Sequence, residues 1–355
     1  MISVAYEVTS LAVSPYGGIA RACYHTLQLA GSHPGLSSLA LYRHGHPDNL
    51  KETSVPSRRS TILSCISSPT YDIVHALCHR LPPVRSRKTI YTVHDVWSLE
   101  TNEYQGESYQ KKLAKRMKRD IARSDMIVTD SEWTRQRLVA LGLAEAGTCH
   151  AVPLGVVIPP TVQPTELSEP VRQVLSLRYV LFVGRIENRK NLGHVVDAVR
   201  SVPNLSLVVV GEPGFGYDEI VARHFVRIPS DRLMRFARLS PSDLTALYHH
   251  AVGTLLPSWE EGFGMPVLEA MAAGSPVITS NRSACAEVAG DAATLVDSDA
   301  PAQSVAALTR LLEDEPYRSE MIEKGRERSQ MFSWERYMQG LLTLYNRVLS
   351  TGGKS

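Results

Sequence analysis

The residues from 256 to 274 have the types and spacing that most clearly predict chemistry. They read Leu-Pro-Ser-Trp-Glu-Glu-Gly-Phe-Gly-Met-Pro-Val-Leu-Glu-Ala-Met-Ala-Ala-Gly, so Glu261 and Glu269 flank a glycine-bearing loop. The pattern predicts a strand, a loop and a helix with Pro266 in its first turn. Backbone N–H groups at such a helix start can hold a phosphate or a developing negative charge. The two carboxylates can accept hydrogen bonds from sugar and ribose hydroxyls.

The alternative is that Glu261 and Glu269 only complement the helix dipole. That interaction is worth only about 0.3–1 kcal/mol per acid. For an isolated pair of acids it would be the better explanation. The Gly-x-Gly between them, the strand before them and the Ala-Ala-Gly exit favour a binding site.

A second group of polar residues lies at 183–191, after another expected strand. Arg185 and Lys190 place two cations on one strand-to-helix loop, which suits a diphosphate leaving group. An arginine can bind two phosphate oxygens at once, whereas a lysine acts as a point charge. Arg189 is a less certain neighbour. Solvated loop cations are the competing interpretation.

Two further loops follow expected strands in the first half of the chain. Gly17 and Gly18 open a helix, where backbone can approach an anionic ligand, although Gly-Gly also serves as a plain turn. His94 and Asp95 end a strand, where His94 can hydrogen-bond a sugar or an attacking hydroxyl and Asp95 can orient its neighbours. Histidine at a strand end is often a structural residue instead.

Other candidates favour structural roles. His75, Cys78 and His79 resemble a metal cluster, but their spacing matches no zinc pair, so core packing is expected. Asp297 and Asp299 copy an Asp-x-Asp metal motif, yet they follow a strand and predict an acidic turn. Six cations at 111–119 predict a basic helix face, which is either solvated or in contact with an anionic membrane or lipid-diphosphate acceptor.

Short β-branched runs alternate with helical patterns throughout, which predicts an α/β fold with parallel sheets. In the first half we expect strands at 2–6, 39–42, 73–76, 89–93, 126–129 and 148–152, and helices at 18–30, 110–124 and 132–141. In the second half we expect strands at 179–183, 205–210, 226–228, 252–256, 277–279 and 293–296, and helices at 191–201, 240–249, 266–273, 301–312 and 334–349.

The length and the proline distribution predict two domains. A chain of 355 residues exceeds the usual size of one domain. Prolines at 159, 160, 164 and 170 mark a linker without apolar periodicity. We expect a first domain at 1–158, a linker at 159–175, a second domain at 176–332, and a C-terminal helix and tail at 333–355. Parallel sheets of this kind bind ligands at the carboxyl ends of their strands.

Composition excludes several classes of protein. A net charge of +2 gives no support to a nucleic-acid partner. Five scattered cysteines without a CxxC pair are typical of reduced cytosolic thiols. Neither a signal peptide nor a membrane span is expected, so we expect a cytoplasmic protein, with any membrane contact peripheral and at the inner face.

Residues 261–274 resemble the signature Glu-Gly-Phe-Gly-x-Pro-x-Leu-Glu-Ala-Met-Ala-x-Gly of the retaining GT-B glycosyltransferases of family four, or group 1. The resemblance is strong over 179–297 and more diffuse over 4–157. It implies two Rossmann-like domains facing a cleft, with the last helix returning to the first domain. It also implies retaining transfer of a hexose from a nucleotide diphosphate sugar without a metal ion or cofactor.

The resemblance also implies roles for the candidate residues. Glu261 would contact the donor sugar, Glu269 the nucleotide ribose, and Arg185 with Lys190 the diphosphate. His94 would lie near the donor sugar. The remaining donor-binding residues would be Gly17, Gly18, Gly262, Phe263, Gly264, Met265 and Pro266.

The substrates are expected in less detail. The pattern is most similar to bacterial enzymes that use GDP-mannose, with a saccharide or lipid-linked saccharide acceptor in cell-surface polysaccharide synthesis. Two alternatives stay open at this point. One is a non-hydrolysing nucleotide-sugar epimerase on the same scaffold, and the other is a non-catalytic subunit that binds nucleotide sugars.

Overall fold

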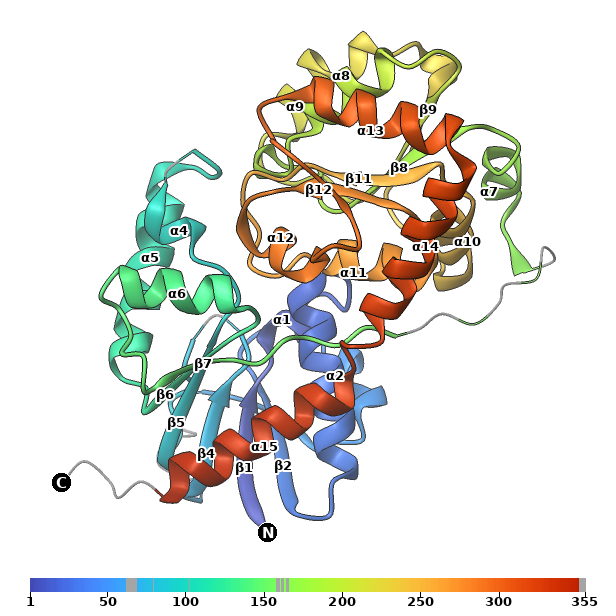
Figure 1. Ribbon diagram of the computed structural model, residues 1–355. Coiled ribbons are helices and arrows are strands. Elements are labelled where there is room, and N and C mark those ends of the chain that lie inside the picture. The colour runs from blue at the N-terminus through green and yellow to red at the C-terminus, as the bar shows by residue number, and fades with distance from the viewer. Residues whose placement is uncertain are drawn as a thin grey trace. The chain divides into compact units, whose positions relative to one another are not determined.

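The computed structural model describes residues 1–61, 69–78, 80–101, 103–157, 160, 163 and 166–350 (Figure 1). It divides into two compact units. Unit 1 comprises Met1–Glu100, Glu107–Gly155 and Ser333–Ser355, and unit 2 comprises Thr101–Gly106 and Val156–Phe332. Each unit is an α/β structure built on a parallel sheet, which confirms the expected fold class.

Unit 1 contains a seven-stranded parallel sheet in the order β3-β2-β1-β4-β5-β6-β7. Its strands are β1 (Ile2–Glu7), β2 (Leu36–Tyr42), β3 (Ser57–Arg59), β4 (Tyr71–Ala76), β5 (Ser86–Val93), β6 (Met126–Thr129) and β7 (Cys149–Ala151). Helices cover both faces of a parallel sheet, so its central strands read as apolar runs. The edge strand β3 is fully exposed and contains no apolar residue, which is why the sequence pattern misses it.

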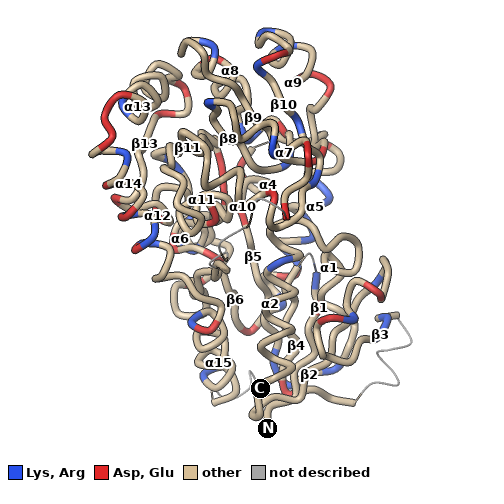
Figure 2. The backbone as a smooth tube through the Cα atoms, turned by 90° about the vertical axis from the view of Figure 1, so that its right-hand side faces the viewer, with Lys and Arg blue, Asp and Glu red and all other residues tan. Residues whose placement is uncertain are grey.

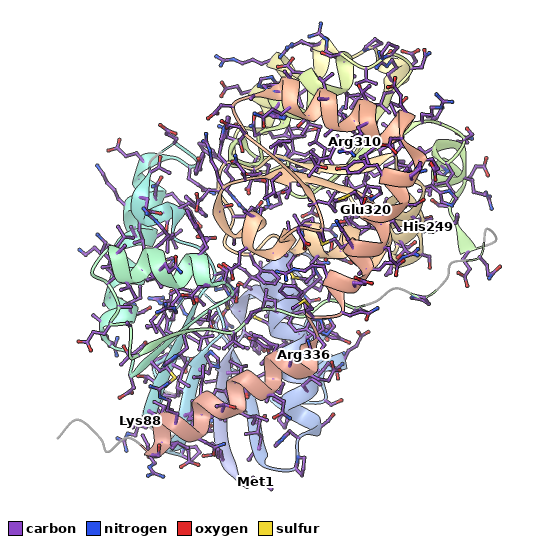
Figure 3. All side chains as sticks on the ribbon, in the orientation of Figure 1. Met1, Lys88, His249, Arg310, Glu320 and Arg336 are labelled. Atoms are coloured by element: carbon purple, nitrogen blue, oxygen red, sulfur yellow. The ribbon has the colours of Figure 1, made fainter. Side chains whose placement is uncertain are left out.

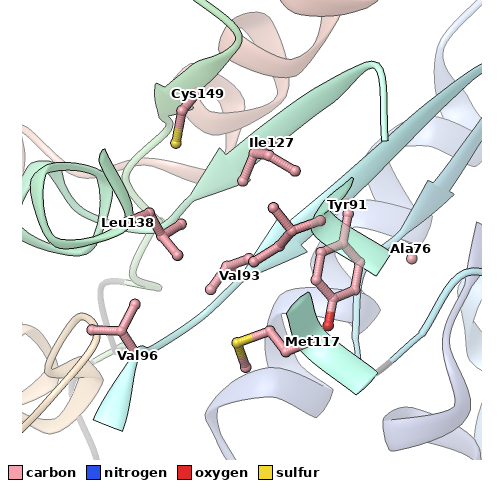
Figure 4. Packing of buried hydrophobic residues seen from close by; sticks show 9 residues of the cluster. Ala76, Tyr91, Val93, Val96, Met117, Ile127, Leu138 and Cys149 are labelled. Carbon is pink, nitrogen blue, oxygen red and sulfur yellow. The ribbon is translucent and has the colours of Figure 1, made fainter. Parts of the chain in front are cut away.

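The helices of unit 1 pack on this sheet. They are α1 (Thr9–Val13), α2 (Gly18–Ser32), the 3₁₀ helix η1 (Pro47–Thr53), α4 (Trp97–Glu100), α5 (Glu107–Ala122), α6 (Glu132–Ala140) and α15 (Trp334–Ser350). Figure 4 shows how Tyr91 and Val93 of β5 pack with Met117 of α5 and Leu138 of α6. This core fixes α5 and α6 against the carboxyl half of the sheet.

Helix α15 returns the end of the chain to unit 1, as expected. Trp334 stacks on His25 of α2 with ring centroids 4.3 Å apart. The buried His75 has a hydrogen-bond partner at each ring nitrogen. Tyr345 Oη lies 2.7 Å from Nδ1, and Thr92 Oγ1 lies 2.8 Å from Nε2. His75 is therefore a core residue, as predicted, and His79 lies outside the described residues.

Unit 2 contains a six-stranded parallel sheet in the order β10-β9-β8-β11-β12-β13. Its strands are β8 (Tyr179–Val183), β9 (Ser206–Val210), β10 (Leu233–Phe236), β11 (Gly253–Leu256), β12 (Val277–Ser280) and β13 (Thr294–Val296). Strands β8, β9 and β11 are almost entirely buried because helices lie on both faces.

The helical elements of unit 2 comprise eight α-helices and three 3₁₀ helices among the described residues. They are α7 (Glu169–Val174), η3 (Asn188–Lys190), α8 (Leu192–Arg200), α9 (Tyr217–Arg223), η4 (Phe225–Arg227), η5 (Ser230–Arg232), α10 (Pro241–His250), α11 (Met265–Ala272), α12 (Ser283–Ala289), α13 (Pro301–Glu313) and α14 (Glu315–Ser329). Charged side chains on α13 and α14, such as the labelled Arg310 and Glu320, lie on their exposed faces (Figure 3).

One expected strand is wrong. Residues 226–228 belong to the 3₁₀ helix η4 and its C-terminal flank, and the edge strand is β10 instead. Phe225 and Ile228 are buried while Val226 is 70% exposed. The buried residues are thus three apart, which is a helical spacing and not the alternation of a strand. A segment this short, with apolar residues at 225, 226 and 228, did not distinguish these two patterns.

Part of the expected linker is ordered structure of unit 2. Helix α7 lies within 159–175, and the backbone N–H of Ser168 donates to Asp243 Oδ1 at 2.9 Å. Residues 158, 159, 161, 162, 164 and 165 lie outside the described residues. Among the helices that the structure describes, none is both long and apolar enough to cross a membrane.

Candidate active site

The predicted strand, loop and helix around Glu261 are present in unit 2. Strand β11 ends at Leu256, and α11 begins at Met265 with Pro266 in its first turn. Gly264 caps the helix with φ +95°, and a Cβ there would lie 3.2 Å from Cys285 Sγ. Glycine at 264 therefore permits both the turn and the close packing beneath it. Gly262 and Phe263 are buried in the same loop.

Glu261 is held as a buried carboxylate by two cations. Lys190 Nζ donates to Oε1, and Arg189 Nη1 donates to Oε2 at 2.9 Å. Ser258 Oγ donates a further hydrogen bond to Oε1 at 3.0 Å. Burial alone would raise the pKa of Glu261, but the charges of Lys190 and Arg189 and their hydrogen bonds lower it to about 2. The carboxylate is therefore ionised at neutral pH.

Arg189 is a site residue that the sequence left uncertain. Besides Glu261, its Nε lies 2.7 Å from Glu187 Oε1, and its Nη1 donates to the backbone carbonyl of Glu260 at 2.9 Å. It joins the loop after β8 to the loop after β11. The only signal in the sequence is its place between Glu187 and Lys190, because its main partner lies 72 residues away.

Arg185 has a different environment from Lys190, although both lie on the loop after β8. Its side chain is exposed, and it makes no ion pair with any residue in the described part of the chain. Gly184 and Gly211 shape this loop. A Cβ on Gly211 would lie 1.9 Å from the carbonyl oxygen of Gly184, so the two loops touch backbone to backbone. This contact restricts the backbone conformation of the loop that contains Arg185.

The other residues of the unit 2 site lie on α8, α10 and α11. Asn191 caps α8, and its Nδ2 donates to the Ser298 carbonyl at 2.7 Å. His194 Nδ1 contacts the same carbonyl at 2.9 Å. Glu269 lies half-buried on α11, where Tyr248 Oη donates to it at 3.3 Å.

The acidic segment after β13 is a turn, as predicted. Arg282 Nη2 lies 2.9 Å from carboxylate oxygens of both Asp297 and Asp299, and Trp259 Nε1 donates to Asp299 at 3.0 Å. The described residues include no cluster of three or more His, Cys, Asp or Glu side chains suited to a metal ion.

His94 has both ring nitrogens engaged at the carboxyl edge of the unit 1 sheet. Nδ1 lies 2.6 Å from Asp130 Oδ2, and Nε2 lies 2.7 Å from the Leu77 carbonyl. Both partners are acceptors, so the arrangement is satisfied when both nitrogens carry a proton. Burial would lower the pKa of His94, but the charge and hydrogen bond of Asp130 together with the Leu77 carbonyl raise it to about 9.

Asp130 is a residue that sequence reasoning missed. It follows β6 and is 2% exposed, and its partner His94 follows β5. Adjacent parallel strands bring their carboxyl ends together, so the pair is 36 residues apart in sequence but in contact. The alternation of strands and helices places both residues at this edge, but nothing local indicates their contact.

Gly17 and Gly18 form the expected glycine turn at the start of α2. Gly17 has φ +123°, precedes the helix as its cap, and offers no side-chain capping group. A Cβ on Gly17 would meet no atom within 4 Å, so the positive φ, and not crowding, favours glycine there. His94, Gly17 and Gly18 belong to unit 1, whereas the remaining predicted site residues belong to unit 2.

Both units are similar in sequence to known proteins. Residues 165–328 match the family model for glycosyl transferases group 1, and residues 19–158 match the model for glycosyltransferase family 4. An O-antigen chain mannosyltransferase B from Escherichia coli is 27% identical over 71% of this chain and 68% of its own. A D-inositol 3-phosphate glycosyltransferase from Corynebacterium glutamicum is 31% identical over 50% of this chain and 45% of its own.

The fold also matches solved structures. Anabaena HepE in complex with UDP and glucose superposes with a TM-score of 0.80 over 98% of this chain and 100% of that one, at 15% identity. The two parallel sheets and this likeness define the GT-B class of fold. The chain belongs to the group 1, or family four, glycosyltransferases, and it is a glycosyltransferase.

Proposed function

We propose that the enzyme transfers a hexose from a nucleotide diphosphate sugar to a saccharide or lipid-linked saccharide, with retention at the anomeric carbon and without a metal ion. The observation that carries this proposal is the Glu261 carboxylate, buried beside the start of α11 and paired with Lys190 and Arg189. A fixed anion accepts hydrogen bonds from sugar hydroxyls, and the helix start favours the negative charge of the donor.

The proposed donor contacts divide among three places in unit 2. Glu261 accepts from hydroxyls of the donor sugar, and Glu269 accepts from the nucleotide ribose. The diphosphate is stabilised by Arg185, whose exposed guanidinium has no competing carboxylate among the described residues, and by Lys190. Because Lys190 already contacts Glu261, we propose that it is shared between the carboxylate and the departing diphosphate.

In the proposed reaction, the residues of the site position the substrates and stabilise the charge that develops. The bond between the anomeric carbon and the diphosphate oxygen breaks as the acceptor hydroxyl attacks the face that the leaving group vacates. The acceptor proton passes to a diphosphate oxygen. Cations placed where this charge develops lower the barrier, and removal of one such donor typically costs about 10²–10³-fold in rate. In this proposal His94 supplies a fixed positive charge from unit 1, because both its nitrogens already have partners.

For the donor we propose GDP-mannose, and for the setting cell-surface polysaccharide synthesis at the cytoplasmic side of the membrane. The similarity to an O-antigen chain mannosyltransferase supports both. Peripheral membrane contact through the basic segment at 111–119 of α5 is part of this proposal. Lys111, Lys112, Lys115 and Lys118 of that helix are exposed. Figure 2 marks the Lys and Arg positions along the backbone in blue.

The test is incubation with labelled sugar nucleotides in the presence and absence of a saccharide acceptor. The proposal expects release of nucleoside diphosphate and label in a new glycoside that depends on the acceptor. Conversion of the sugar nucleotide to an epimer without any acceptor would identify an epimerase. Tight binding with neither reaction would identify a binding subunit. A thermal-shift comparison of GDP-, UDP- and dTDP-sugars then tests the donor, with GDP-mannose expected to stabilise most.

A further inference from the structure

Three arginines gather in unit 1 from segments far apart in the sequence. Arg43 directly follows β2, Arg80 lies in the loop after β4, and Arg116 lies on α5. Strands β2 and β4 flank β1 in a parallel sheet, so their carboxyl ends share one edge. All three side chains are partly buried.

Backbone contacts hold the three segments in place. The Arg43 N–H donates to Thr9 Oγ1 at 3.1 Å, beside the end of β1. Arg59 Nε donates to the Arg43 carbonyl at 3.0 Å. On the other side, the Leu81 N–H donates to Asp120 Oδ2 of α5 at 3.4 Å, which ties the Arg80 loop to the helix that carries Arg116.

The charges of Arg43 and Arg116 both act on the guanidinium group of Arg80. Burial lowers the pKa of Arg80, and the charges of Arg43, Arg116 and Arg119 lower it further, while Asp120 opposes them. Asp120 is fully buried and already paired with Arg119, whose Nη2 lies 2.7 Å from Oδ1. Positive charge therefore exceeds negative charge around Arg80.

The nearby carboxyl groups do not balance this charge. Glu7, at the end of β1, is buried and bonded by Cys78 Sγ at 2.9 Å, and burial raises its pKa well above the usual range, which favours the neutral acid. Asp130 is paired with His94. Within the described ranges, Arg43, Arg80 and Arg116 make no ion pair, and the buried Arg116 Nε contacts no acceptor.

Like charges that are brought together and half-buried destabilise a fold. A cluster of this kind therefore favours a binding role over a structural one. Guanidinium groups present planar donor forks that match phosphate and carboxylate oxygens, and such bonds strengthen as solvent is excluded. We propose that Arg43, Arg80 and Arg116 form a binding site for an anionic group, a phosphate or a carboxylate, carried by the acceptor. That the anion belongs to the acceptor rests on the function proposed above, whereas the anion site itself does not.

The site can be tested by binding alone, without donor or turnover. Isothermal titration calorimetry of the full chain would use inorganic pyrophosphate in one arm and glucuronate in the other. Both arms use an Arg185→Gln background, because Arg185 is proposed to hold the donor diphosphate in unit 2. Pyrophosphate and glucuronate distinguish a phosphate-bearing acceptor from an acidic sugar.

The expected result is that one of the two probes binds and that binding weakens roughly tenfold or more with each of Arg43→Gln, Arg80→Gln and Arg116→Gln. Arg123→Gln is the matched control. It removes one cation at an exposed position directly after the same helix, outside the basic segment at 111–119. It should leave binding within about twofold, since an exposed charge contributes little.

Thermal unfolding gives a second readout that a structural role would not match. If the arginines are kept for binding, Arg80→Gln relieves repulsion, and its unfolding midpoint should equal or exceed that of the parent. A marked fall in the midpoint would mean that the cluster supports the fold, and it would overturn the proposal. So would binding of neither probe, or binding that is indifferent to all three arginines.

Failure here is distinguishable from failure of the proposed function. If sugar transfer occurs but neither anion binds in unit 1, only the anion site is wrong. If an anion binds through these arginines but no sugar nucleotide reacts, the site stands and its assignment to an acceptor is overturned.

Discussion

At Glu261, burial favours the neutral acid, whereas two cations favour the ionised carboxylate and have the larger effect. The pKa of about 2 means that the carboxylate remains charged wherever the enzyme is folded at ordinary pH. The same cations, Lys190 and Arg189, are needed to keep it so. If Lys190 binds the donor diphosphate as proposed, the diphosphate competes with Glu261 for that cation, and donor binding would depend on the position of Glu261.

Replacing Glu261 with glutamine should destabilise unit 2 by about 3 kcal/mol at pH 7, because the buried Lys190 loses its counter-charge and Arg189 keeps only Glu187. Chemical denaturation measures this change, and Glu327→Gln on the exposed face of α14 is the control. The contribution of Glu261 is fully present above its unfolded pKa near 4.5 and is lost as pH falls toward about 2. Equal stability of the two variants at pH 7 would contradict the buried ion pair.

At His94 the sign of the linkage is opposite. Its folded pKa of about 9 lies above the unfolded value of 6.5, so the stability it contributes is complete below pH 6.5 and is lost as pH rises through about 9. Asp130→Asn removes the charge that sustains the imidazolium, and burial should then take the pKa of His94 below 6.5. NMR titration of the His94 ring reports both values. A wild-type value near 6.5 would show that Asp130 does not control this charge.

Among elements, the loop after β8 depends on a contact between two glycines. Gly184 and Gly211 follow neighbouring strands; a side chain at Gly211 would collide with the Gly184 carbonyl, and at Gly184 the φ of +148° disfavours one. The position of Arg185 and of η3, with Arg189 and Lys190, follows from that contact. Helix α11 depends similarly on Gly264 at its start.

Gly211→Ala should therefore cost about 1–3 kcal/mol of stability, because its Cβ would overlap the Gly184 carbonyl and force the loop to move. We also expect weaker binding of sugar nucleotides. Gly147→Ala is the control, since a Cβ there meets nothing within 4 Å. Thermal unfolding and titration with donor nucleotide measure the two effects. If the donor affinity is unchanged, the contact between these two loops does not affect the donor site.

The sequence predicted the elements that carry a strong local pattern. The strand, loop and helix around Glu261 follow from a buried run, two glycines and a proline, all local signals. Strand β3 was missed because it has no apolar residue. Residues 226–228 were misassigned because Val226, Arg227 and Ile228 alternate in polarity as a strand does. Edge elements depend on their neighbours, which a local pattern does not contain.

At the scale of the whole molecule, the sequence predicted two α/β units but not the contacts between distant segments. Glu261 meets Arg189, and His94 meets Asp130, because parallel strands align their ends. Which side chains then touch depends on loop conformations that no short motif specifies. Helix α15 illustrates the same point, since its return to unit 1 was expected but its hydrogen bond to His75 was not.

Tyr345→Phe tests how firmly α15 completes unit 1. The change leaves His75 Nδ1 without the hydroxyl at 2.7 Å, in a site where both residues are buried, and should cost about 1–2 kcal/mol. Tyr109→Phe, at an exposed position on α5, should cost almost nothing. Denaturation followed separately in the two units should place the loss in unit 1. A loss confined to unit 2 would contradict the assignment of α15.

The central claim is that cations of unit 2, and not a metal ion, stabilise the departing diphosphate. The most direct measurement is the rate of nucleoside diphosphate release from the sugar nucleotide, with EDTA present, for the wild type, for Arg185→Ala and for Arg185→Ala combined with Lys190→Ala. We expect full wild-type activity in EDTA, a fall of about 10²-fold for Arg185→Ala and a further fall for the double variant. Near-normal rates in the double variant, or loss of wild-type activity in EDTA, would contradict the claim.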